Sequence, residues 1–388
     1  MNRSCPICCE LNYPMKPTKK ITLLLFAVLG AYFIASCQGP NSKAPELVIA
    51  ETDTQEQKLE KAREWLKELQ QNNHFNGGVL LIKNDAVIFK ETFGYTDYTQ
   101  SKELDVHSAF RLASVSKQFT AVGIMLLKEE GKLEFDDPIT KYLPSLKYSK
   151  STIRNLLNHT SGVPDAYMGF PRKYKDEIGS ELEISEVVEL LAKADLPYAS
   201  EPNSTFKYNN TGYVLLAAII ESVSGESFES FMNRELFEKL NMQDSRVWNL
   251  VTKNPEFKNK TGSYSIDNGK ITELPPGVFD GISGDGGIFC SLNDFIIWNQ
   301  FWTKNDLLSE ETIAEAFKKS TFNNGKENTY AFGWNVTDNG GAWHNGSWLG
   351  ARTLIARNGN LKNCIVVLDN SSSIHVDFIG QQLVQLLR

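Results

Sequence analysis

The stretch that decides the fold is residues 78–93, which read GVLLIKNDAVIFKETF. Two apolar runs, 78–83 and 86–93, flank Asn84-Asp85, a pair that tolerates the left-handed backbone of a tight hairpin turn. Near the other end of the chain, runs 352–357 and 363–368 flank Asn358-Gly359-Asn360 in the same way. An isolated hairpin is only marginally stable in water. We therefore expect both hairpins to join in one antiparallel sheet built from both chain ends.

Helical patterns surround and separate these hairpins. Before the first hairpin, apolar residues recur at helical spacing at Leu59, Ala62, Trp65, Leu66 and Leu69. An apolar helix over about 376–387 is expected to close the chain. Residues 115–320 are mainly helical in pattern, with segments such as 118–127 and 213–223 rich in Leu, Ala and Ile. The sequence thus predicts an α/β (α+β) fold, with terminal helices flanking the sheet and a mainly helical region inserted between the hairpins.

Composition excludes several classes of protein. The chain has 388 residues, of which 41% are hydrophobic, so it can bury a large core and is not disordered in bulk. It carries 40 Lys and Arg against 47 Asp and Glu, and no sustained basic run, which argues against nucleic acid as a partner. Five His without a His-x-x-x-His pair, together with few Cys, argue against a zinc hydrolase. We expect no metal and no other cofactor.

The first residues form a targeting segment. Lys16, Lys19 and Lys20 precede an apolar run, 21–36, that is shorter than the ~20 residues needed to span a bilayer. The run ends in Ile34-Ala35-Ser36-Cys37, which resembles the lipobox of bacterial lipoproteins. Residues 1–37 are therefore predicted to be a lipoprotein signal peptide with Cys37 as the lipidated residue. The alternative is an ordinary cleavage site followed by an incidental cysteine.

Three further expectations concern the start of the chain, the segment after the signal peptide and the cysteines. Residues 1–14 precede Met15, a plausible start directly before the basic region, and are interpreted as a mis-assigned start or an untranslocated extension. Residues 38–54 are polar and contain Pro40 and Pro45, as suits a tether to a membrane. Only Cys290 and Cys364 lie beyond the targeting segment, so a disulfide framework is not expected.

The first chemical motif is Ser114-Val115-Ser116-Lys117, at an apparent transition from strand to helix that Gly131 would end. On a helix, residues three apart share a face, so the Lys117 ammonium can reach the Ser114 hydroxyl. A serine hydroxyl needs an adjacent base to become a nucleophile, and a desolvated Lys or a Tyr can serve. Ser204 and Lys207 have the same spacing, but they lie in a polar, extended segment where positions i and i+3 point apart.

Two more elements follow in the sequence. Tyr208-Asn209-Asn210 places a phenol and an amide two residues apart, on one side of an extended segment. His344-Asn345-Gly346-Ser347 directly precedes the second hairpin. There, Gly346 would allow close approach of a substrate to the backbone, and the Ser347 N–H could pair with that of Ser114 as an oxyanion hole.

These elements, in this order, resemble the serine β-lactamase and penicillin-binding-protein superfamily. Phe110-Arg111-Leu112-Ala113 before the serine and LLNHTSG at 156–162 add to the resemblance. The second element is Tyr-x-Asn, which is similar to the class C β-lactamase-like branch with its esterase, D-aminopeptidase and DD-peptidase relatives. The resemblance runs from about residue 75 to 387. It implies a β-lactamase or DD-peptidase-like fold and a serine hydrolase domain over 55–388.

The resemblance also implies roles for the residues. Ser114 would form an acyl-enzyme, Lys117 would assist its deprotonation, and Tyr208 would pass the proton to the leaving group and later activate water. Either Lys117 or Tyr208 could be the base. Asn210 would orient Lys117 and the substrate amide, with a plain helix cap as its alternative role. His344, Gly346 and Ser347 would bind the substrate, and a plain strand position is the alternative for His344.

The third element departs from the Lys-Thr-Gly of many true β-lactamases, where the Lys attracts the substrate carboxylate. His344 stands there instead, and an imidazole of ordinary pKa is mostly neutral at pH 7. We therefore expect an esterase or peptidase rather than an efficient β-lactamase. Arg352 could supply the missing charge, although an exposed strand Arg is the favoured interpretation. Residues 284–287, GDGG, are interpreted as a turn, and His159 as a residue that ends a helix before Gly162.

The function predicted is that of a secreted, lipid-anchored serine hydrolase of the bacterial cell envelope, acting on an ester, amide or β-lactam. Its partners would be a small-molecule or peptide-like acyl substrate and, through the lipid anchor, a membrane. The alternative is a non-hydrolytic member that binds penicillin or senses peptidoglycan.

The lipid anchor gives the first testable prediction. Replacing Cys37 by Ala should abolish metabolic labelling of the protein with a fatty acid, because the thiol is the acceptor of the lipid. Labelling is measured by growth with an alkyne-tagged fatty acid followed by gel fluorescence. Undiminished labelling of Cys37→Ala would exclude this residue as the anchor.

Overall fold

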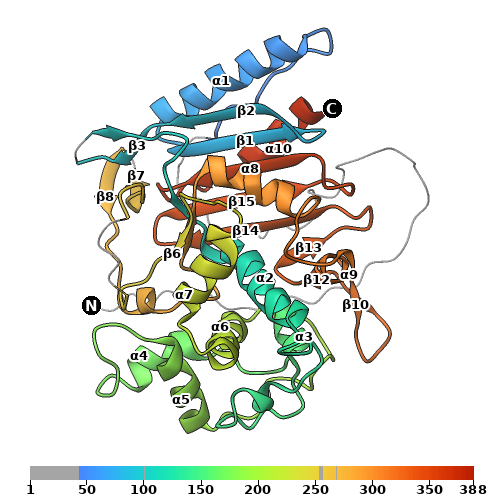
Figure 1. Cartoon of the computed structure of the whole chain (residues 1–388). Coiled ribbons are helices and arrows are strands. Elements are labelled where there is room, and N and C mark those ends of the chain that lie inside the picture. The colour runs from blue at the N-terminus through green and yellow to red at the C-terminus, as the bar shows by residue number, and fades with distance from the viewer. Residues whose placement is uncertain (1–42, 100, 253–256, 268) are drawn as a thin grey trace. The chain divides into compact units, whose positions relative to one another are not determined.

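The computed structural model describes residues 43–99, 101–252, 257–267 and 269–388. Its central feature is one seven-stranded antiparallel sheet with the strand order β12-β13-β14-β15-β16-β1-β2 (Figure 1). The strands of this sheet are β1 (Gly77–Lys83), β2 (Ala86–Phe93), β12 (Tyr330–Ala331), β13 (Trp334–Val336), β14 (Ala342–Trp348), β15 (Ala351–Arg357) and β16 (Cys364–Asp369). The prediction of one sheet built from both chain ends is confirmed.

Both expected hairpins are present, and they pair with each other through β1 and β16, where Val79 lies opposite Val367. Asn84 and Asp85 have φ of 52° and 66°, the left-handed backbone that a two-residue hairpin turn requires. The buried Asp369 carboxylate stabilises the pairing of β1 with β16, because it accepts N–H bonds from Asn76, directly before β1, at 2.9 Å and from Ser371 at 2.8 Å. Burial raises the Asp369 pKa to about 6.

Helices cover both faces of the sheet, which explains why nearly all of β1 is buried. Figure 1 shows α8 (Leu292–Phe301) across the face toward the viewer, α10 (Val376–Leu383) behind β15 and β16, and α1 (Gln55–Gln71) along β2. The chain ends in a 3₁₀ turn at Val384–Leu387. The expected terminal helices are therefore in place.

The inserted region packs around α2 (Ser116–Glu129), which is buried over most of its length against α6 (Asn210–Ser224). Shorter helices complete this region: α3 (Ile153–Leu157), α4 (Phe170–Lys173), α5 (Ile184–Ala194), α7 (Phe228–Met232) and α9 (Glu310–Glu315). α2 ends as predicted, with Gly131 in a left-handed conformation at φ 69°. α3 ends just before His159, as expected, but the first left-handed residue after the helix is His159 itself, at φ 55°, and not Gly162, which is left-handed at 69° farther along the chain.

Residues 115–320 are mainly helical, as expected, but they also contain short strands, and further short strands lie on either side of them. β5 (Phe110–Arg111), β9 (Ile288–Cys290) and β6 (Arg246–Val247) form one small sheet, and β7 (Tyr264–Asp267) pairs with β8 (Lys270–Glu273). Two further pairs join β3 (Tyr95–Asp97) to β4 (Lys102–Glu103) and β10 (Ser320–Thr321) to β11 (Glu327–Asn328). Strands of two to four residues are too short to show an alternating pattern in the sequence.

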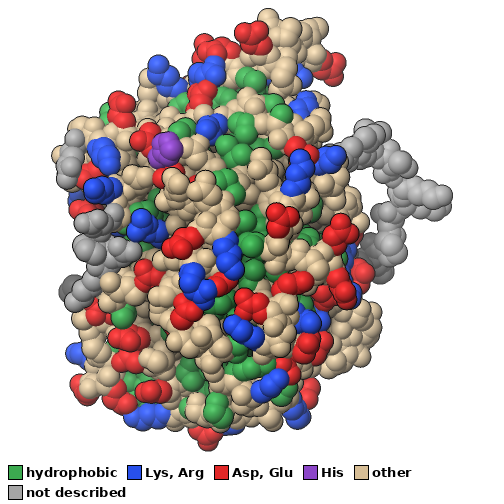
Figure 2. Space-filling model, in the orientation of Figure 1, with side chains coloured by type: hydrophobic (Ala, Val, Ile, Leu, Met, Phe, Trp, Pro, Cys, Tyr) green, Lys and Arg blue, Asp and Glu red, His purple; other side chains and the backbone are tan. Residues whose placement is uncertain are grey.

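The predicted tether, 38–54, falls partly outside the described residues, as do the signal peptide and Cys37. Its described part contacts the folded unit: the Pro45 carbonyl accepts a bond from the Trp65 indole at 2.8 Å, and the Leu47 N–H donates to Gln382 at 3.0 Å. Among the described residues, no helix is both long and apolar enough to cross a membrane. Figure 2 shows acidic and basic side chains interspersed over the face in view.

Candidate active site

Ser114 lies in a 3₁₀ turn, Ala113–Val115, between β5 and the start of α2. Ala113 is left-handed at φ 49°, a conformation that costs a non-glycine residue on the order of 1–3 kcal/mol and that clusters at functional sites. The turn is held from both sides, because the Leu112 carbonyl accepts a bond from Thr353 of β15 at 2.8 Å and the Leu112 N–H donates to Ile288 at 2.8 Å. These contacts fix the half-buried Ser114 at the junction of sheet and helices.

Lys117 is the second residue of α2, one helical turn after Ser114, and is fully buried. Its ammonium donates to Ser114 Oγ at 3.2 Å, as the spacing predicts, and also to Asn210 Oδ1 at 2.9 Å and to the Asp285 carbonyl at 2.7 Å. These three acceptors match the three N–H donors of an ammonium group. A buried charge without such partners would be costly, so the contacts both stabilise Lys117 and tie three segments of the chain together.

Tyr208 and Asn210 reach the site from the start of α6. Asn209 is the N-cap of this helix, since its side chain accepts the Gly212 N–H at 2.8 Å. The neighbouring Asn210 is thus free to bind Lys117 and is not the cap. Tyr208 is 38% exposed, lines the cleft, and holds its ring 5.0 Å from the Lys117 ammonium. The alternative pair is elsewhere engaged: Ser204 donates to the Glu201 carbonyl and Lys207 to the Ala199 carbonyl.

His344 on β14 is buried, and both of its ring nitrogens are engaged. Nδ1 lies 2.6 Å from the Asn345 carbonyl, which can only accept, so Nδ1 carries the proton. Nε2 must then accept the Tyr330 hydroxyl at 3.0 Å. Burial, together with the nearby Lys117 charge, lowers the His344 pKa to about 3. The imidazole is therefore neutral, as expected, and its nitrogens are occupied by the protein.

Gly346 and Ser347 follow His344 along β14, beside the turn that carries Ser114. A Cβ on Gly346 would lie 2.4 Å from the Leu112 carbonyl oxygen, 2.5 Å from Thr353 Oγ1 and 3.0 Å from the Ser114 nitrogen. The glycine is therefore needed for the strand to pack against the Ser114 turn, and not only for a substrate to approach. Ser347 is exposed at the cleft.

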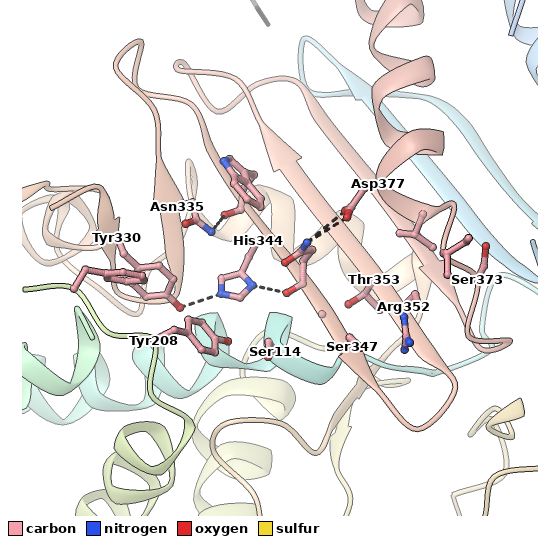
Figure 3. Close-up of a pocket in the computed structure, with 16 residues that line it drawn as sticks. Ser114, Tyr208, Tyr330, Asn335, His344, Ser347, Arg352, Thr353, Ser373 and Asp377 are labelled. Carbon is pink, nitrogen blue, oxygen red and sulfur yellow. Dashed lines mark hydrogen bonds between the residues drawn. The ribbon is translucent and has the colours of Figure 1, made fainter. Parts of the chain in front are cut away.

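Ser114, Tyr208, His344, Gly346 and Ser347 line one cleft of about 550 Å³ (Figure 3), and Lys117 lies beneath it in contact with Ser114. Arg352 and Asp377 also line it and are half-buried, and neither forms an ion pair within the described residues. Burial lowers the Arg352 pKa and raises that of Asp377. The favoured interpretation of Arg352 as a plain exposed strand residue is wrong, because its guanidinium contributes to the wall of the cleft.

The structure thus brings together the predicted residues of all three motifs, whose catalytic and binding roles stay predictions.

Sequence reasoning missed three contributors: Asp285, Tyr330 and His159. The GDGG stretch is the turn that was expected, but its Asp285 carbonyl binds Lys117 and its side chain accepts the Tyr167 hydroxyl at 2.7 Å. No local sequence pattern indicated Tyr330, because its hydrogen-bond partner, His344, lies on another strand of the sheet.

Comparison with known proteins agrees with this arrangement. The family model described as Beta-lactamase matches residues 62–386. A penicillin-binding protein of Bacillus subtilis (strain 168) is 34% identical over 78% of this chain and 69% of its own length. A penicillin-binding protein from Bacillus halodurans superimposes with a TM-score of 0.71 and 25% identity, over 83% of this chain and 99% of that one. A D-amino acid amidase from Ochrobactrum anthropi shares the fold at 21% identity and a TM-score of 0.66, covering 85% and 97% of the two chains.

The fold and the clustered motifs define a protein of the β-lactamase and penicillin-binding-protein class. The chain belongs to the beta-lactamase family.

The packing of β14 against the Ser114 turn gives the second prediction. Replacing Gly346 by Ala should push the strand away from Ser114 and lower turnover about 10²-fold, because small misplacements in an active site have effects of that size. The midpoint of thermal unfolding should also fall, since added core volume typically destabilises by about 1–3 kcal/mol. Both are measured on purified protein. Gly179→Ala is the control, because nothing lies within 4 Å of its added Cβ; equal behaviour of the two variants would refute the argument.

Proposed function

We propose that this protein is a secreted, lipid-anchored serine hydrolase that acts on esters or amides through an acyl-enzyme on Ser114. The observation that carries the proposal is the buried Lys117 ammonium, which binds Ser114 Oγ and Asn210 Oδ1 at the same time. A buried cation in contact with a half-exposed serine is costly as mere packing, and it lowers the energy of an alkoxide forming on Ser114. The lipid anchor is supported by the sequence around Cys37.

In the proposed reaction, Ser114 Oγ attacks the substrate carbonyl carbon and its proton passes to the Lys117–Tyr208 pair in the form that has lost one proton, so that either the lysine amine or the tyrosine phenolate is the acceptor. Tyr208, which faces the cleft, returns a proton to the departing alcohol or amine, and the acyl group stays bonded to Ser114. The same pair then takes a proton from water, whose oxygen attacks the acyl carbon. The bond to Ser114 Oγ breaks, the proton returns to that oxygen, and the acid is released. The N–H groups of Ser114 and Ser347 would bind the oxyanion. Every step uses a group that lines the cleft or contacts Lys117.

The alternative is a penicillin-binding or peptidoglycan-sensing protein that acylates slowly or only binds, which the names of the two Bacillus relatives favour. The two candidates differ in whether an acyl-enzyme forms and is then hydrolysed. The partly exposed Tyr208 and the open cleft favour access of water to the acyl-enzyme, and hence hydrolysis.

The third prediction tests the nucleophile. Ser114→Ala should lose on the order of 10⁴-fold or more in turnover of a chromogenic ester, because binding and oxyanion contacts alone remain. It should also lose covalent labelling by a fluorophosphonate and by a fluorescent penicillin. Ser204→Ala is the matched control from the other Ser-x-x-Lys and should change little. Labelling that survives in Ser114→Ala would overturn the proposal, whereas labelling of wild type without ester or cephalosporin turnover would favour the non-hydrolytic alternative.

The fourth prediction concerns the charge of the substrate. His344 is neutral and buried, so the positive charge that lines the cleft comes from Arg352. Arg352→Gln should lower kcat/KM for a carboxylate-bearing cephalosporin about 10-fold or more and leave a short neutral ester almost unchanged, because a charge-assisted hydrogen bond is worth about 1.5–3 kcal/mol.

Asp377→Asn provides the opposite control for this prediction. It removes a negative charge from the same cleft and should raise kcat/KM for the anionic substrate relative to the ester. Equal effects of Arg352→Gln on both substrates would show that the residue acts on the scaffold and not on substrate charge.

A further inference from the structure

His159 occupies an unusual place behind the cleft. Its backbone is left-handed at φ 55°, and its ring is buried among aromatic side chains. Ring centroids lie 4.3 Å away at Tyr208, 4.4 Å at Tyr330 and 5.1 Å at Tyr213. One imidazole therefore contacts both the proposed proton-transfer residue, Tyr208, and the tyrosine that binds His344.

The same residue also holds the backbone on either side of Tyr208. The His159 carbonyl accepts the Lys207 N–H at 2.9 Å, and His159 Nδ1 accepts the Asn209 N–H at 3.2 Å. The neighbouring Thr160 carbonyl accepts the Asn203 N–H at 2.8 Å, which extends the contact along the segment. Tyr208 is thus fixed at three points, by the residue before it, by the residue after it and by its ring.

The chemistry of the ring shows why packing alone does not account for a histidine here. Because Nδ1 accepts a hydrogen bond, the neutral ring carries its proton on Nε2. Nε2 is buried without a hydrogen-bond partner among the described residues, a situation that destabilises a protein and needs an explanation. A phenylalanine would fill the space without that penalty but could not accept the Asn209 N–H. Burial and the nearby Lys117 lower the His159 pKa well below its usual value, so the ring holds no positive charge at neutral pH.

We propose that His159 is a positioning residue that sets the place of the Tyr208 phenol opposite Ser114 and Lys117, by clamping the backbone on both sides of Tyr208 and packing beneath its ring. The role is one of placement and not of proton transfer, since the ring contacts no reacting atom. The inference rests on the proposed function, because it assumes that Tyr208 takes part in acylation.

Three variants separate the parts of this role. His159→Phe keeps an aromatic ring and removes the acceptor. His159→Asn keeps an acceptor at nearly the same position and tolerates the left-handed backbone, but it removes the ring. Leu190→Ala is the control, because it creates a cavity at a buried position on α5, outside the cleft.

The first measurement does not depend on activity. In His159→Phe, hydrogen–deuterium exchange of the peptide covering 203–210 should speed up about 10-fold or more, because this variant alone removes the acceptor for the Asn209 N–H. Exchange should remain near the wild-type rate in His159→Asn and be unchanged in Leu190→Ala. Unchanged exchange in His159→Phe would overturn the clamp, whether or not the protein proves to be a hydrolase.

The second measurement is the rate of covalent labelling of Ser114 by a fluorophosphonate, alone and in the Tyr208→Phe background. In the wild-type background, His159→Phe should slow labelling about 10²-fold, with little change in the probe concentration that gives the half-maximal rate. His159→Asn should recover much of that loss. In the Tyr208→Phe background, His159→Phe should have an effect of about 3-fold or less, because a residue that acts through Tyr208 has nothing left to position. Independent, multiplying effects of the two substitutions would overturn the inference. Wild type that fails to label at Ser114 would instead refute the proposed function and leave the exchange experiment to decide the clamp.

Discussion

The rest of the site depends on one constraint, the burial of the Lys117 ammonium. A charged group without water must find acceptors for its three N–H bonds, and no single helix can offer them. Here they come from three places: Ser114 one turn earlier, Asn210 at the start of α6, and the Asp285 carbonyl in the turn before β9. The lysine therefore determines how α2, α6 and that turn meet, and the same contacts place Ser114 at the cleft.

The sheet supplies the other wall of the site, and its construction from both chain ends explains how. β1 must insert beside β16 before the sheet is complete, and Asp369 joins the start of one strand to the end of the other. β15 then carries Thr353 to the Leu112 carbonyl, and β14 passes so close to the Ser114 turn that only glycine fits at position 346. Residues more than two hundred positions apart thus fix Ser114 between them. The free energy of folding and the geometry of the site are coupled through these contacts.

Features that depend on neighbouring residues in the chain could be predicted from the sequence. Features that depend on contacts between distant parts of the chain could not. The left-handed turn at Asn84 and Asp85 and the shared helical face of Ser114 and Lys117 depend only on neighbours in the chain, and both follow from the sequence. The Asp285 carbonyl could not be predicted as a ligand of Lys117, because a backbone atom leaves no signature in residue type. The burial of His344 and the pairing of β9 with β5 and β6 depend on partners far away in the sequence, whose approach no local pattern records.

The neutral state of His344 follows first from its own burial and then from the nearby charge of Lys117. Burial and the Lys117 charge together lower its pKa to about 3, because a second cation in this dry part of the cleft would repel the first. Both ring nitrogens then form hydrogen bonds within the protein: Nδ1 donates to the Asn345 carbonyl and Nε2 accepts from the Tyr330 hydroxyl. Arg352 on the adjacent strand is half-buried at the cleft and forms no ion pair among the described residues. Burial lowers its pKa, and the charge of Asp369, which lies opposite it on β16, partly offsets this effect. In the proposed function, an anionic substrate would therefore be attracted by a residue of β15 and not by one of the motif strand β14.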